Sequence, residues 1–344
     1  KDAKSTEKLS GPKDLIKQVK DITLPVDNMD GDALPVSVFV PHADGQWELG
    51  ASAYEKRGVA VTVPHWDSAK CVQCNQCAYV CPHATIRPIA LTEEEAKNAP
   101  KDIKVVEFKA GKGKGIYKFT MSVSPLDCMG CGVCVNMCPA GALEMKPLHE
   151  ELSQQEVFNY CVEKVTDKED IIDETVKGSQ FRTPLLQFSG SCAGCAETSY
   201  ARLVTQLFGD RMYISNATGC SSIWGGAAGI SPYAVGKNGK GPAWCNSLFE
   251  DNAEHGLGMF VGQKKIREDL AARIAVMAQE GKDPEIKALA QAWVDTKEDG
   301  EANQKASRDL IAALEAKKCD CENRKEILAK KDYLNKKSVW IFGG

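Results

Sequence analysis

The sequence lacks long apolar runs: no stretch approaches the roughly 20 residues of a bilayer span. No secretory signal pattern stands at its start, which favours a reducing, cytoplasmic compartment. Neither sign of charge is in excess, because 43 Lys and Arg stand against 47 Asp and Glu, for a net charge of −4. This balance argues against binding to nucleic acid or to an anionic membrane.

Disordered and fibrous chains are excluded by composition, since 43% of the residues are apolar and 26% are charged. A length of 344 residues is enough for about two domains. The 15 cysteines fall short of the roughly 8–10% typical of disulfide scaffolds. Their positions are more informative than their number, because eight of them lie between Cys71 and Cys138.

The N-terminal part, residues 1–66, is polar at first and then carries strand-like runs at 36–40 and 59–63. Prolines bound these runs, so we expect an extended lead-in and not a helix. Farther along, alternating residues at 105–108 and 117–121 flank a glycine-rich stretch at 111–115. This pattern predicts a hairpin with a plain turn at its tip.

Residues 149–178 are charged and weakly patterned, which is typical of a linker. From residue 179 to 344, helical and strand patterns alternate, which favours a doubly wound parallel α/β sheet. Apolar stripes predict helices at 200–208 and 266–277, and a charged stretch predicts an exposed helix at 303–332. Strands are expected at 212–215 and 339–342.

The last strand is followed by Gly343 and Gly344, and such a turn normally leads into another element. We therefore expect a piece of a longer polypeptide, with an α/β domain that is incomplete at its C-terminal side. The alternative is a processed start and a true C-terminus.

Two runs of cysteine share one spacing, Cys-x2-Cys-x2-Cys-x3-Cys-Pro, at 71–82 and 128–139. This spacing is that of bacterial two-cluster ferredoxins, in which three thiolates hold one 4Fe–4S cube and the fourth reaches the other cube. The predicted ligands of the first cluster are Cys71, Cys74, Cys77 and Cys138, and those of the second are Cys128, Cys131, Cys134 and Cys81. Residues 67–148 are therefore expected to form an α+β ferredoxin-like domain with a hairpin insert.

Zinc and disulfides are the alternatives to clusters. Zinc sites use two separated pairs of ligands, unlike these runs closed by proline. Disulfides need an oxidising compartment, which no targeting signal indicates. His83, just after the first run, is expected to be a packing or rim residue and not a ligand. Cys161 is expected to be an isolated buried thiol, and Cys319 and Cys321 would point to different sides of a helix.

A further set of thiols lies among small residues, at Cys192, Cys195 and Cys220. A Cys-x2-Cys pair alone is ambiguous, because redox pairs and half zinc sites share it. Here the pair directly precedes a predicted helix, whose free N–H groups would suit an anion or cluster sulfurs. The three thiolates are one short of a cluster.

Residues 181–260 resemble the start of the thiamine-diphosphate domain of the long, single-chain pyruvate:ferredoxin (flavodoxin) oxidoreductases. The stretches that carry the resemblance are 190–198, 217–222 and 241–254, and 54–60 and 71–77 are also similar to that family. The resemblance covers nearly the whole chain, but the chain corresponds to only a minor part of such an enzyme.

This resemblance implies that Cys192, Cys195 and Cys220 bind a third 4Fe–4S cluster and that Glu197 lies beside thiamine diphosphate. The fourth ligand, the Gly-Asp-Gly signature for Mg²⁺ and the pyruvate-contacting residues would lie outside this chain, so we expect no catalytic residue in it. Cys245 stands where the family has a small residue, and it is an alternative fourth ligand. His255 stands where an aromatic residue is expected.

The implied reaction is the oxidative decarboxylation of pyruvate with coenzyme A to acetyl-CoA and CO2. Electrons would pass through three clusters to ferredoxin or flavodoxin, in a cytoplasmic homodimer of anaerobic metabolism. Two alternatives remain: a sister oxidoreductase acting on another 2-oxoacid, and a stand-alone iron–sulfur electron-transfer protein in which residues 179–344 form a docking domain.

Overall fold

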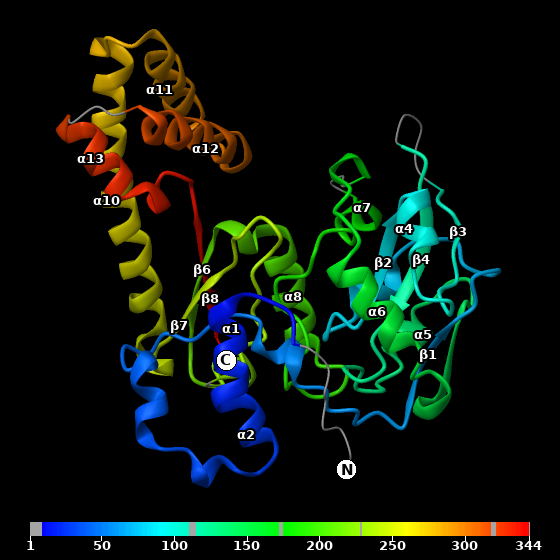
Figure 1. Ribbon diagram of the computed structural model, residues 1–344. Coiled ribbons are helices and arrows are strands. Elements are labelled where there is room, and N and C mark those ends of the chain that lie inside the picture. Colours follow the sequence, from blue (N-terminus) through cyan, green and yellow to red (C-terminus); the bar gives the residue numbers. More distant parts are fainter. Residues whose placement is uncertain (1–8, 110–114, 172–174, 228, 318–320, 344) are drawn as a thin grey trace. The chain divides into compact units, whose positions relative to one another are not determined.

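The computed structural model describes residues 9–109, 115–171, 175–227, 229–317 and 321–343, and Figure 1 shows its helices and strands. The chain forms two compact units, Lys1–Asp210 with Cys220–Pro242, and Arg211–Gly219 with Ala243–Gly344. The structure thus does not divide at residue 179, where we expected a boundary. One reason is that α8 (Ala196–Phe208) packs against α3 (Gln76–Val80) inside the first unit.

The first unit combines short helices with antiparallel strands. Its other helices are α1 (Lys13–Gln18), α2 (Leu24–Asp27), α4 (Glu93–Lys97), α5 (Val133–Asn136), α6 (Gln154–Glu163), α7 (Val176–Ser179) and α9 (Cys220–Gly225). Its strands are β1 (Thr62–Trp66), β2 (Ile86–Leu91), β3 (Val106–Glu107), β4 (Lys118–Val123) and β5 (Leu143–Pro147).

These strands form two small sheets, in which β1 pairs with β5 and the order of the other sheet is β2-β4-β3, all antiparallel. The pairing of β3 with β4 confirms the predicted hairpin, although most of its expected tip lies outside the described residues. Pro88 is tolerated inside β2 because this strand is at the edge of its sheet.

The core of the first unit includes cysteines of both runs. Trp66, Ile86 and Phe119 pack there with Cys77, Cys81 and Cys134, all of them buried. The side chain of Phe119 is fully buried, and its ring lies edge-on to that of Trp66 at a centroid distance of 5.9 Å. Several of the predicted cluster ligands thus belong to an apolar core.

The prediction of an extended lead-in is wrong for much of residues 1–66. Residues 13–27 are helical, and 36–42 form a 3-10 helix in place of the expected strand. Leu15, Val19 and Ile22 recur at helical spacing and are buried, which explains the helix. Only the last two residues of the second run lie in a strand, β1, and Pro64 lies inside β1 because this strand pairs on one side alone.

Two further predictions from patterning need correction. Residues 149–178 are not a plain linker, because α6 buries Val157, Phe158 and Cys161. The helix predicted at 200–208 is present as α8, but its most buried side chains are not those of the apolar stripe. They are Thr198, Ala201, Arg202, Thr205 and Gln206.

The second unit has a parallel sheet of order β7-β6-β8, formed by β7 (Ala243–Asn246), β6 (Met212–Asn216) and β8 (Ser338–Phe342). The strands predicted at 212–215 and 339–342 are therefore confirmed. Its helices are α10 (Asn252–Glu280), α11 (Pro284–Thr296), α12 (Gly300–Ala316) and α13 (Glu322–Ala329).

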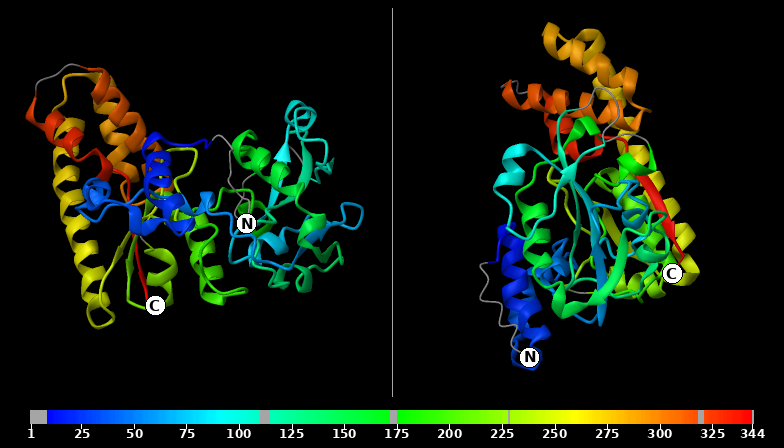
Figure 2. Two further views of the ribbon diagram at one scale, coloured as in Figure 1. Left: turned by 60° about the horizontal axis from the view of Figure 1, so that its bottom comes forward. Right: turned by 90° about the vertical axis from the view of Figure 1, so that its right-hand side faces the viewer.

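Helix α10 contacts β6 and β8, and α11, α12 and α13 gather about its C-terminal half, as all three views show (Figures 1 and 2). Trp293, Leu310 and Ile327 are fully buried in this helical group. The single exposed helix predicted at 303–332 is therefore two helices with buried apolar faces. None of the described helices combines the length and apolar character that crossing a membrane takes.

Candidate iron–sulfur centres

One small cavity of the first unit is lined by four thiols. Its lining includes Cys71, Cys74 and Cys77 from the first run together with Cys138 from the second. The rest of the lining is mainly apolar and includes Trp66, Val72, Met121, Ala140, Ala142 and Leu143. The structure therefore brings together the four thiols that the spacing predicts for one cluster.

A second cavity of about 350 Å³ has the complementary set of thiols. Cys128, Cys131 and Cys134 come from the second run, and Cys81 comes from the first. Other lining residues are Pro64, His83, Thr85, Ile86, Met129, Gly132, Val133 and Met145. Each run thus contributes its fourth cysteine to the cavity of the other run.

The two runs also fold into loops of the same backbone conformation. Gln73 and Gly130 occupy equivalent places, with φ of 59° and 69°, and Asn75 and Gly132 have φ of 62° and 72°. In each loop the N–H of Gln73 or Gly130 donates to the sulfur of the first cysteine, over 3.4 Å in both cases. These left-handed positions turn the backbone amides toward the sulfurs, which favours the thiolate that binds iron.

This geometry predicts unequal tolerance to substitution at two glycines. A Cβ at Gly130 would lie 3.1 Å from the carbonyl oxygen of Thr62, whereas at Gly132 it would meet nothing within 4 Å. We expect Gly130→Ala to lower the free energy of unfolding by about 1–2 kcal/mol, because φ is positive and space is short. Gly132→Asn should be nearly neutral, since Asn75 already occupies the equivalent place. Chemical unfolding of the anaerobic protein measures both, and equal losses for the two variants would contradict the argument.

Burial dominates the electrostatics of the thiols. It raises the pKa of Cys128 to about 12, and it raises the pKa of Cys77 and Cys134 well above the ordinary range. Such groups form thiolates only when a cation replaces the lost hydration, so the cavities suit positively charged iron. Among the described residues, no three His, Cys, Asp or Glu side chains gather closely enough for a single metal ion.

The third set of thiols is more open. Cys192 is exposed and Cys195 partly buried, in the turn before α8, where the N–H of Cys195 donates to the carbonyl oxygen of Cys192 over 3.1 Å. Cys220 is exposed at the first residue of α9. Cys245, also exposed, lies on β7 of the second unit.

Glu197 lies in the first turn of α8 and is partly buried. Its charge adds to burial in raising the pKa of Tyr233, whose hydroxyl is buried. Several buried polar atoms from this part of the first unit have no hydrogen-bond partner among the described residues: Thr198 Oγ1, Ser221 Oγ, Trp224 Nε1 and Tyr233 Oη. Buried polar atoms normally have partners, so this region fits a polar group that binds there.

His83 lines the second cavity and also contacts the segment that carries Cys192. Its ring is buried, with Nδ1 3.2 Å from the carbonyl oxygen of Ser189 and Nε2 3.2 Å from that of Cys192. Its own carbonyl oxygen accepts the N–H of Phe188. Both ring nitrogens thus face carbonyl groups, in agreement with a packing role. In the second unit, His255 Nδ1 lies 2.7 Å from Ser215 Oγ.

The remaining cysteines lie apart from these sets. Cys161 is buried, and burial raises the pKa of its thiol to about 12. Cys321 is exposed directly before α13, and Cys319 lies outside the described residues. The expectation of an isolated buried thiol at Cys161 agrees with this placement.

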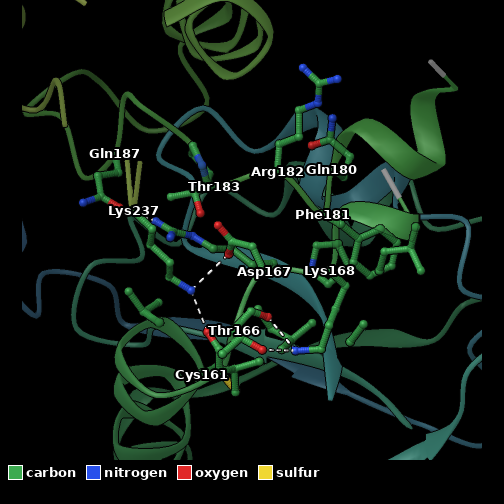
Figure 3. Close-up of a pocket in the computed structure, with 18 of the residues that line it drawn as sticks. Cys161, Thr166, Asp167, Lys168, Gln180, Phe181, Arg182, Thr183, Gln187 and Lys237 are labelled. Carbon is green, nitrogen blue, oxygen red and sulfur yellow. Dashed lines mark hydrogen bonds and ion pairs between the residues drawn. The ribbon is translucent and has the colours of Figure 1, made fainter. Parts of the chain in front are cut away.

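A further cavity of about 860 Å³ borders β2, the end of α6 and residues 180–187 (Figure 3). Its lysines are already paired: Lys168 Nζ lies 2.9 Å from a carboxylate oxygen of Glu95, and Lys237 Nζ lies 3.0 Å from that of Asp167. Cys161 is on its wall, but the eight thiols of the two runs are not among its described lining residues. We therefore assign the redox chemistry to the two smaller cavities.

Comparison with known proteins matches two parts of the chain to family models. A family model described as a 4Fe-4S dicluster domain matches residues 70–142, which include all eight thiols of the two runs. Another model, named EKR and described as a domain of unknown function, matches residues 4–60.

Long relatives match the chain from end to end. A pyruvate-flavodoxin oxidoreductase of Enterobacter agglomerans is 45% identical over 346 residues, covering 98% of this chain and 29% of that protein. A pyruvate:ferredoxin oxidoreductase of Moorella thermoacetica is 45% identical over 334 residues, covering 95% of this chain and 28% of that protein. This chain resembles a segment of these oxidoreductases. The family resemblance drawn from the motifs is thereby confirmed.

The name of the acceptor differs among the relatives. A mitochondrial pyruvate dehydrogenase [NADP(+)] of Euglena gracilis is 43% identical over 335 residues, covering 96% of this chain and 18% of that protein. Relatives of this segment thus occur in proteins named for flavodoxin, ferredoxin or NADP⁺. The chain spans less than a third of the length of each of these three relatives.

Proposed function

We propose that this chain is the electron-transfer region, with part of the cofactor-binding region, of a pyruvate:ferredoxin or pyruvate:flavodoxin oxidoreductase. The observation that carries this proposal is the exchange of cysteines between two cavities, each with three thiols of one run and one of the other. That arrangement lies within a segment 45% identical to pyruvate-flavodoxin and pyruvate:ferredoxin oxidoreductases.

Two 4Fe–4S clusters would supply one-electron chemistry that no side chain of the protein provides. The proposed ligands are Cys71, Cys74, Cys77 and Cys138 for one cluster, and Cys81, Cys128, Cys131 and Cys134 for the other. The chain keeps these sites dry through the aromatic and aliphatic core around Trp66, Ile86 and Phe119. A dry site favours a low reduction potential, as transfer to a ferredoxin requires.

The third thiol set would serve the cluster nearest the organic donor. We propose Cys192, Cys195 and Cys220 as its ligands, with a fourth from elsewhere in the protein or from Cys245. Glu197 would contact thiamine diphosphate, the group that stabilises the carbanion formed from pyruvate. The unpartnered buried groups near α8 and α9 support a bound cofactor in this region. The Mg²⁺ site, the coenzyme A site and a homodimer interface would involve other parts of the protein, including the remainder of the proposed doubly wound domain.

The test measures the iron and sulfide content of the protein and the reduction of an external electron acceptor. Anaerobically prepared protein of this length should hold about eight irons with matching acid-labile sulfide, and the complete protein encoded by the gene about twelve. The complete protein should reduce flavodoxin or ferredoxin only with both pyruvate and coenzyme A present, and this 344-residue chain should not turn over.

The outcomes separate the competing functions. Twelve irons with turnover on a longer 2-oxoacid would indicate a sister oxidoreductase. Eight irons without thiamine binding in the complete protein would indicate a stand-alone electron-transfer protein. Colourless protein would contradict the cluster proposal altogether.

A further inference from the structure

Two arginines of the first unit are buried without a carboxylate partner. Arg87 on β2 has 6% of its surface exposed, and Arg202 on α8 has 1%. Within the part of the chain that the structure describes, no salt bridge joins either guanidinium to Asp or Glu. Arginine is almost never buried unless it is paired, so both positions need an explanation.

Both guanidinium groups bind the backbone beside one cysteine. Arg202 Nη2 donates to the carbonyl oxygen of Tyr79 over 2.6 Å, and Arg87 Nε donates to that of Ala84 over 2.8 Å. Tyr79 precedes Cys81 by two residues and Ala84 follows it by three. The two positive charges therefore flank the cysteine that the first run contributes to the second cavity.

The other partners of these arginines carry no charge. Arg202 Nη1 donates to the side-chain oxygen of Gln206 over 2.8 Å, and its Nε has no partner among the described residues. Arg87 Nη2 donates to the side-chain oxygen of Gln187 over 2.6 Å, and its guanidinium lies over the ring of Phe158 at 5.1 Å. Amides and rings orient a guanidinium, but they do not cancel its charge.

One buried carboxylate acts on Arg87, and it is shared with a lysine. Asp127 is buried, and its carboxylate lies 2.6 Å from the ammonium of Lys56. Burial lowers the pKa of Arg87 to about 10, opposed first by the charge of Asp127 and then by that of Cys81. Burial also lowers the pKa of Arg202, and here negative charge at Cys81 opposes the effect. A positive excess thus remains around Cys81, and it requires an anion that the described side chains do not supply.

We propose that Arg87 and Arg202 are the counterions of the cluster held by Cys81, Cys128, Cys131 and Cys134, and that they stabilise its reduced form. This inference rests on the cluster assignment of the proposed function. Reduction adds one electron from the pyruvate-derived donor and neither forms nor breaks a bond, so the cluster with its thiolates gains one negative charge. Two fixed cations in a dry site favour that state and raise the reduction potential. Arg87 and Arg202 are the buried arginines among the described residues, so the effect should fall on one cluster of the pair.

The experiment is an EPR-monitored redox titration of the complete, cluster-loaded protein, with iron and sulfide counted for every variant. Arg202→Gln removes the charge and leaves a neutral amide donor, whereas Arg202→Lys keeps the charge. Arg87→Gln repeats the test at the other site. Arg267→Gln is the matched control, because Arg267 is also partly buried and donates to backbone carbonyls, those of Tyr333, Leu334 and Lys297, none of which flanks a thiol of the two runs.

We expect Arg202→Gln to move the oxidised-to-reduced ratio of one cluster at least tenfold toward the oxidised form, which is 59 mV lower for one electron. The potentials of the other clusters should not move, and the Arg267→Gln control should leave every potential unchanged. Arg202→Lys should stay closer to the wild type than Arg202→Gln. If both glutamine variants lose about four irons while Arg202→Lys keeps them, the result also supports the proposal, because it shows that this cluster requires the positive charge.

An unchanged potential in Arg202→Gln and Arg87→Gln with full iron content would overturn the proposal. Equal shifts in both clusters, or equal effects of glutamine and lysine at position 202, would do so as well. Wild-type protein without the expected iron would instead refute the proposed function, so the two failures are distinguishable.

Discussion

Cys81→Ala is expected to remove about four of the roughly eight irons bound by the two runs, and to spare the cluster held by the other three cysteines of its own run. The reason is that Cys81 lines the cavity of Cys128, Cys131 and Cys134. A simple reading of the sequence, with each run binding its own cluster, makes the opposite prediction about which cluster is lost.

The measurement combines iron and sulfide analysis with EPR of the reduced protein. To identify the surviving cluster, the double variants Cys81→Ala/Cys74→Ser and Cys81→Ala/Cys131→Ser are compared. Only the variant with Cys74 replaced should lose or alter the remaining EPR signal. Cys161→Ala is the control, since Cys161 is buried but lies outside both thiol cavities, and it should keep all the iron. A surviving cluster that depends on Cys131 would show that the thiols are not exchanged.

Trp293→Ala is expected to lower the free energy of unfolding of the second unit by about 3–5 kcal/mol. Trp293 lies on α11, and its indole is fully buried in the core that α11 shares with α10 and α12. Its Nε1 donates to Oγ of Ser307 on α12 over 3.0 Å. The guanidinium of Arg267 lies over its ring, 5.5 Å from the centroid. The substitution therefore opens a cavity and leaves the Ser307 hydroxyl without this donor.

Chemical unfolding followed by circular dichroism measures this effect. The helices α10 to α13 share one core, so loss of their helical signal reports unfolding of that core. Phe260→Ala on α10 is the control, because 48% of the Phe260 surface is exposed and its removal should cost much less. Both variants should retain the iron content of the wild type, because Trp293 and Phe260 lie in the other compact unit. Similar losses of stability for the two variants would contradict the packing described here.

The two sets of four thiols in the ferredoxin-like part were predictable from the sequence. A 4Fe–4S cluster requires a fixed spacing of cysteines in a short loop, and that spacing indicates which thiols share a cavity. The helical residues 13–27 were missed because the prolines beside the strand-like runs at 36–40 and 59–63 were extended to the whole N-terminal part. The available signal was the helical spacing of Leu15, Val19 and Ile22, which are buried.

Helix α8 shows a second limit. Its apolar stripe identified the helix correctly, but the stripe is not its most buried face. Arg202 and Gln206 lie inward because carbonyl groups of Tyr79 and Arg182 accept their hydrogen bonds. Hydrophobic periodicity detects a helix, but it cannot show that polar partners elsewhere in the chain favour the other face. The polar side chains at 198, 202, 205 and 206 recur at helical spacing, and that pattern was the available signal.

The exchange of a thiol between two cavities has a consequence for how such a domain matures. Neither set of four is complete until both loops are present, so iron loading at one half cannot finish before the other half has been synthesised. The antiparallel pairing of β1 with β5 encloses both loops, because β1 precedes the first and β5 follows the second. Half of this domain therefore contains no complete set of four ligands.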